Sequence, residues 1–151
     1  MFEFILDTFK KQNNTDTNSK NHAIQISACA LFLEIAHIDD NLTIDEEQKI
    51  INIMKNEFSL SEEEINSLIS KSKEEIKKSV SVYEFTEIVN KHFDSNEKFN
   101  LIKNLWHIAF VDGNIDQYEE HYIKKICSNL HLSHKDRIAA KLEVKKEMGL
   151  K

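Results

Sequence analysis

The near absence of turn residues is the feature that most constrains the fold of this chain. Its 151 residues include no proline and only two glycines, Gly113 and Gly149. Since strands joined by tight turns depend on these residues, the sequence predicts an all-α, single-domain protein of seven to eight helices. The two cysteines, Cys29 and Cys127, lie in apolar helical stretches, which favours reduced and buried thiols.

Helix starts are marked where Ser or Thr is followed three residues later by an acid, because such a pair can form a capping box. This pattern occurs at Thr43 with Glu46, Ser61 with Glu64, Ser81 with Glu84 and Ser133 with Asp136, and Asp116 with Glu119 is its aspartate version. Residues 24–38 and 101–111 are apolar on nearly all sides. They are predicted to form two buried central helices, enclosed by amphipathic ones.

The N-terminal region differs from the rest of the chain. Residues 1–21 are expected to form an amphipathic helix and a polar linker, followed by a helical domain over residues 22–151. The apolar side of that helix carries Phe2, Ile5, Leu6 and Phe9, and the polar segment runs from residue 12 to residue 21. We expect the helix to pack on its own domain, with docking to a partner or a membrane surface as the alternative.

An internal repeat organises the body of the chain. Shifting the sequence by 73 residues superposes residues 35–47 on residues 108–120, with six of the thirteen positions identical. After a one-residue deletion, residues 58–61 correspond to residues 130–133. The sequence therefore predicts two pseudo-repeated helix-turn-helix hairpins around the two central helices, separated by a spacer over residues 62–96.

The repeated turn also carries a family resemblance. An apolar helix ends in Ala-x-x-Asp-Gly-x-Ile, here Ala109 to Ile115, and an acidic pair opens the next helix; the pattern is present twice. This resembles the TerB family, named for tellurite resistance, over about residues 22 to 148. The resemblance implies an all-helical domain, a role in tellurite or metal stress, and coupling to a membrane-bound partner complex. The first repeat departs from the pattern at Asp40, where the motif has glycine.

The repeated acids suggest a cation site. Asp39 and Asp112 each follow a helix, where the macrodipole disfavours a carboxylate by a few tenths to about 1 kcal/mol. Either an Asx turn or a bound cation could offset this cost, and both alternatives stay open. The candidate metal ligands are Asp39, Glu46, Glu47, Asp112, Glu119 and Glu120. Capping already explains Glu46 and Glu119, so Glu47 and Glu120 are the freer ligands.

The ligand types limit which divalent cation would bind. Oxygen donors favour calcium or magnesium. The second turn begins like a calcium loop at Asp112, but Gln117 and Ile123 stand where an EF-hand requires glycine and glutamate, so an EF-hand is not expected. His37 and His107 lie close enough in sequence to the turns to permit mixed ligation of zinc.

Charge and missing motifs narrow the class of function. The net charge of −6 disfavours nucleic acid and favours cations or basic protein surfaces, and Arg137 is the only arginine. No nucleophile with an adjacent base, phosphate-binding glycine loop or complete metal signature is present, so enzymatic activity is not expected, and no small-molecule substrate is identified. Acids stand where a signal peptide carries lysines, which predicts a cytoplasmic protein. The TerB resemblance implies a peripheral location at the inner face of the membrane through partners.

The leading hypothesis is therefore a non-enzymatic acidic helical module of a tellurite or metal-stress response, which binds a divalent cation at its two turns. The alternative is a metal-independent protein–protein interaction adaptor that couples to a membrane-associated partner complex.

Overall fold

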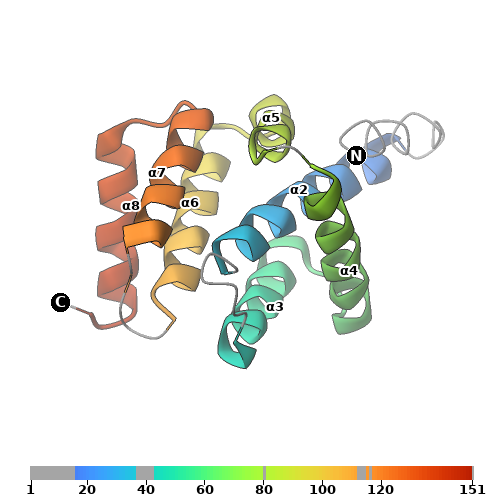
Figure 1. Cartoon of the computed structure of the whole chain (residues 1–151), viewed down its shortest axis with the longest axis horizontal. Helices are drawn as coiled ribbons and strands as arrows, with labels where there is room; N and C mark the ends of the chain where they lie inside the picture. Colours follow the sequence, from blue (N-terminus) through green and yellow to red (C-terminus); the bar gives the residue numbers. More distant parts are fainter. Residues whose placement is uncertain (1–15, 37–42, 80, 112–114, 116, 151) are drawn as a thin grey trace.

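The computed structural model describes residues 16–36, 43–79, 81–111, 115 and 117–150, and side chains from residue 21 onward. These residues form seven helices: α2 (Asp16–Ala36), α3 (Ile44–Phe58), α4 (Glu62–Lys78), α5 (Tyr83–His92), α6 (Ser95–Ala109), α7 (Gln117–Asn129) and α8 (His134–Glu147) (Figure 1). The described ranges contain no strand, so the predicted all-α fold is confirmed.

Capping boxes determine where several helices begin. Thr43, Ser61 and Ser133 each accept a hydrogen bond from the backbone N–H three residues on, and the acid there accepts one back from the cap residue, as predicted. The box predicted at Ser81 is wrong. Its hydroxyl instead accepts from the N–H of Tyr83, two residues on, at 3.2 Å, so α5 begins without a side-chain cap.

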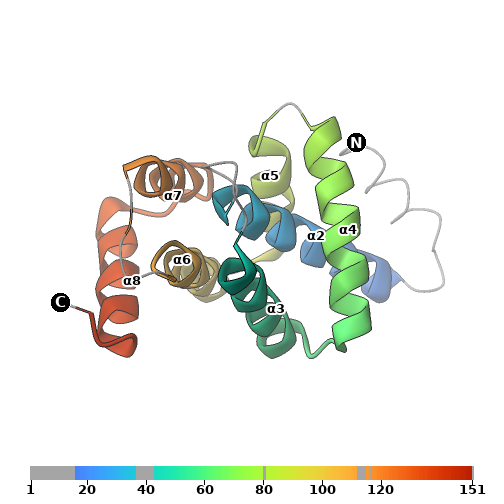
Figure 2. The same ribbon diagram turned by 60° about the horizontal axis from the view of Figure 1, so that its bottom comes forward.

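The two predicted central helices are α2 and α6. Leu31 and Leu33 of α2 and Leu105 and Trp106 of α6 are all fully buried. Helix α2 packs against α3, α4, α5 and α6, while α6 packs against α2, α3, α7 and α8 (Figure 2). One core therefore joins both halves of the chain, and Trp106 is a core residue, as expected from its size.

The repeat extends over three helices rather than two. Helix α4 packs mainly on α2, and α8 packs in the same way on α6, so α2–α3–α4 corresponds to α6–α7–α8. Ser59 and His131 occupy equivalent positions in the repeat, and both adopt a left-handed backbone with φ of 54° and 62°. Helix α3 also contacts α6, and α7 contacts α2, so the two units pack on each other through equivalent helices.

Helix α5 belongs to neither unit and fills part of the predicted spacer. It packs on α2 and α7, and Asn90 donates a 2.7 Å hydrogen bond to the carbonyl oxygen of Asn129 at the end of α7. The insertion therefore ties the first unit to the second.

The N-terminal boundary differs from the prediction. Helix α2 begins at Asp16, so the segment expected to be a polar linker up to residue 21 is helical over its second half. The predicted helix over residues 1–11 lies outside the described residues, and the division into residues 1–21 and 22–151 stays a prediction. Within the described part of the chain, no helix is long and apolar enough to cross a membrane.

Candidate functional site

The first acidic turn leads into α3. The backbone N–H of Thr43 donates to Glu46 Oε1 at 3.0 Å, and the Thr43 hydroxyl accepts from the Glu46 N–H at 3.1 Å. One carboxylate oxygen of Glu46 is thus committed to the cap. Glu47, half-buried on the same turn, makes no side-chain hydrogen bond or ion pair with the described residues, which leaves its carboxylate available.

The second acidic turn leads into α7, where Glu119 and Glu120 are both half-buried. Glu120 Oε2 lies 3.4 Å from Lys141 Nζ of α8. Lys141 in turn sits 5.2 Å from the ring centroid of Trp106, a cation–π contact that holds the ammonium group against the core. The sequence indicated that Glu120 is a freer ligand, but its carboxylate is shared with Lys141.

The remaining predicted ligands cannot be placed. Asp39 and Asp112 lie outside the described residues, as do His37 and most of the calcium-loop-like segment over residues 112–116. Among the described residues, no three His, Cys, Asp or Glu side chains form a group that could hold a metal ion. A cation site at the turns therefore stays a prediction.

His107 is engaged elsewhere. Its Nε2 lies 2.9 Å from Glu147 Oε1 on α8, and burial lowers the pKa of the imidazole, with the Glu147 contact partly offsetting this effect. Lys103, one turn earlier on α6, donates to Glu147 Oε2 at 2.9 Å. These contacts of Lys103 and His107 with Glu147, which join α6 to α8, were not predicted from the sequence. The signal was the matching i, i+4 spacing of Lys103 with His107 and of Glu143 with Glu147.

The position after the capping acid distinguishes the two acidic turns. In α4, α6 and α8 the capping box ends at the third helical residue, and the fourth is Ile65, Lys98 and Arg137, respectively. In α3 the fourth residue is Glu47, and the repeat places Glu120 at the corresponding position of α7. Capping requires only the first of the two acids. The second acid at the other turn, Glu120, pairs with Lys141, so only Glu47 has no role in capping and no ion-pair partner among the described residues.

The family profile described as tellurite resistance protein TerB matches residues 25–142. The chain belongs to the TerB family. The match runs from α2 into α8, so it spans most of both three-helix units of this TerB chain. It confirms the resemblance seen in the repeated turn. Searches of curated proteins and of solved structures return no match for this TerB chain.

Proposed function

We propose that this TerB-family chain is a non-enzymatic, cytoplasmic module of a tellurite or metal-stress response and that it binds a divalent cation at its two acidic turns. The observation that carries the proposal is the second acid, Glu47 and Glu120, which capping does not require and which the repeat preserves. The family relationship supports the stress-response context.

The chemistry of the candidate ligands favours calcium or magnesium over zinc. The candidate ligands Asp39, Glu46, Glu47, Asp112, Glu119 and Glu120 all offer oxygen atoms, which hard cations prefer. The imidazole of His107, which lies close in sequence to the second turn, is bonded to Glu147, which removes one nitrogen that zinc could use.

Thermal unfolding tests the proposal. A cation that binds only the folded state at about 100 times its Kd stabilises the protein by roughly 2.7 kcal/mol. For a chain of this size the gain in Tm is about 5–10 °C. We expect calcium or magnesium, compared with chelator, to give this gain and the double variant Asp39→Asn, Asp112→Asn to lose it.

The matched control removes two carboxylates elsewhere. Glu63 and Glu74 are exposed on α4, so the variant Glu63→Gln, Glu74→Gln has the same net charge as the double turn variant. It should respond to ions like the wild type. An equal gain in the Asp39→Asn, Asp112→Asn variant would show that the turns are not the site, and no gain with any divalent ion would refute cation binding.

Exposed apolar residues beside the turns favour the adaptor as a second candidate function. Ile44 on the first turn of α3 is 85% exposed, and Tyr118 on the first turn of α7 is 66% exposed. Large apolar side chains at equivalent ends of both units suit a protein-binding surface, here for a membrane-associated partner.

A pull-down from membrane extract, with and without chelator, tests the adaptor function. The adaptor predicts a partner that is retained in chelator and lost with Ile44→Ser, Tyr118→Ser; a partner equally retained by that variant would contradict it. Deletion of residues 1–11 would test the N-terminal contribution separately.

A further inference from the structure

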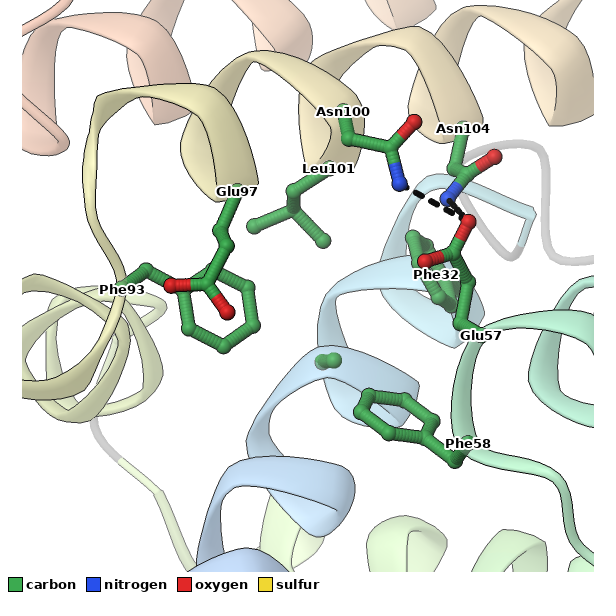
Figure 3. A pocket seen from close by; sticks show the side chains of 9 residues that line it. Phe32, Glu57, Phe58, Phe93, Glu97, Asn100, Leu101 and Asn104 are labelled. Atoms are coloured by element: carbon green, nitrogen blue, oxygen red, sulfur yellow. Dashed lines mark hydrogen bonds between the residues drawn. The ribbon is translucent and has the colours of Figure 1, made fainter.

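A pocket of about 110 Å³ lies where the end of α3 meets α2 and α6 (Figure 3). It combines aromatic surface with carboxylates, and it is lined by Ala28, Phe32, Glu57, Phe58, Phe93, Glu97, Asn100, Leu101 and Asn104. None of these residues belongs to the acidic turns. Glu57 is eleven residues after Glu46, roughly 16 Å further along α3, so this is a separate site.

The apolar part of the pocket is formed largely by aromatic rings. Phe32 and Leu101 are buried, whereas Phe58 and Phe93 are half-buried and remain accessible. Figure 3 shows the rings of Phe58 and Phe93 at opposite sides of the pocket. Aromatic faces attract cations and also pack against aliphatic chains.

Two carboxylates stand at the rim of this apolar surface. Glu57 Oε1 accepts hydrogen bonds from the side-chain amides of Asn100 and Asn104 at 2.8 and 3.2 Å, which fixes the carboxylate beside the pocket (Figure 3). Its Oε2 accepts no hydrogen bond from the described residues. Glu97 Oε1 accepts from the backbone N–H of Asp94 at 2.9 Å as part of a capping box, and its second oxygen remains for a ligand.

The charged residues that line the pocket are all negative. No lysine or arginine is among the described residues that line it, while two carboxylates are. The chain as a whole carries a net charge of −6, so its field also attracts cationic groups. A suitable ligand therefore combines a positive charge with an apolar stem.

We propose that this pocket binds the side chain of a lysine displayed by a partner protein. The aliphatic stem packs against the rings of Phe58 and Phe93, and the ammonium donates to Glu57, while the carboxylate of Glu97 adds negative charge at the rim. The volume is smaller than the cavity of ~150 Å³ that accommodates benzene, which suits a narrow unbranched chain better than a large planar group. This interaction does not depend on a cation at the acidic turns.

An NMR titration tests the proposal on the full chain. The probe is the blocked tripeptide acetyl-Gly-Lys-Gly-amide, and the matched peptide contains norleucine, which has a similar stem without charge. We expect saturable shifts at the backbone amides of Phe58, Phe93 and Glu97 with the lysine peptide and at least about 10-fold weaker binding of the norleucine peptide. Equal binding of both peptides would overturn the proposal. Butylamine binding as tightly as the lysine peptide would overturn the assignment to a protein partner.

Variants separate the pocket from general charge effects. Glutamine is compatible with the third position of a capping box, so Glu97→Gln should keep the fold and weaken lysine binding by about 2- to 5-fold, as should Glu57→Gln. Glu64→Gln is the matched control, since Glu64 holds the same capping position on α4 outside the pocket. Ala28→Met fills the cavity without changing charge and should abolish binding in a chain that still melts cooperatively. Equal weakening by Glu97→Gln and Glu64→Gln, or undiminished binding to Ala28→Met, would refute the site.

Discussion

The contact between α6 and α8 can be tested by replacing Glu147 with glutamine. Lys103 and His107 each lie 2.9 Å from a different oxygen of this carboxylate, and they are 20% and 18% exposed, whereas Glu147 is 48% exposed. Exposed ion pairs contribute about 0.2–1 kcal/mol, and the second hydrogen bond adds to this. Because Glu147 is half in solvent, we expect a loss of about 1 kcal/mol at neutral pH, or about 2–4 °C in Tm.

The pH dependence of this loss follows from the pKa shifts. The Lys103 hydrogen bond, followed by the one from His107, holds the pKa of Glu147 below its ordinary value of 4.5. Its stabilising contribution is therefore present above pH 4.5 and is lost as the pH falls through the lower folded-state pKa. Burial lowers the pKa of His107 below 6.5, so protonation of this imidazole also costs stability as the pH falls below 6.5.

The difference in Tm between the wild type and Glu147→Gln should change in opposite directions in two pH ranges. Without its carboxylate partner, His107 becomes harder to protonate in the folded state, so the difference in Tm between wild type and Glu147→Gln should grow between pH 6.5 and 4.5. As the pH falls from 4.5 through the lower folded-state pKa of Glu147, the wild-type carboxylate becomes protonated, and the difference should shrink. Melting curves from about pH 3 to pH 8 measure both trends, and Glu143→Gln, which removes only a 3.3 Å contact to Lys103, should show a smaller effect. A difference in Tm that stays constant over this range would refute the reasoning.

Two further predictions follow from burial and capping. Burial raises the pKa of Cys29 to about 11 and that of Cys127 to about 12, so neither thiol should react with a disulfide reagent at pH 8 until the protein unfolds; rapid reaction of the folded chain would contradict this. Ser133→Ala removes the cap of α8 and should lower the free energy of unfolding by about 1 kcal/mol, or the Tm by about 2–4 °C. Ser81→Ala should cost less, because Ser81 forms no capping box. Equal losses for the two variants in calorimetry would contradict this prediction.

The parts of the fold that could be predicted from sequence are those encoded locally. The boxes at Thr43, Ser61 and Ser133 are complete in four consecutive residues, and the structure contains all three. Asp94 with Glu97 forms a further box that is not among those predicted, although it follows the same aspartate pattern as Asp116 with Glu119. At Ser81 the hydroxyl had a competing donor nearby, which the spacing alone cannot reveal.

Long-range contacts are less accessible to this reasoning. The repeat predicted two hairpins and not the third helix of each unit. The third helices, α4 and α8, share little sequence similarity beyond the turns that precede them, at Ser59 to Ser61 and at His131 to Ser133. Likewise, no local pattern shows that Lys141 lies between Glu120 and Trp106, since these residues come from three different helices. The candidate site was therefore predicted as a set of residues, while their pairing required the structure.

That pairing bears on the proposed cation site, because it makes the two turns unequal. Glu47 is without a partner among the described residues, whereas Glu120 already shares its charge with Lys141, which is held in place by Trp106. A cation at the second turn must either compete with the ammonium group or leave Glu120 out of its ligand set, and both alternatives weaken binding. If cations bind as proposed, the duplicated motif should therefore not produce two equivalent sites: the first turn should bind more tightly, although its sequence departs further from the family pattern at Asp40.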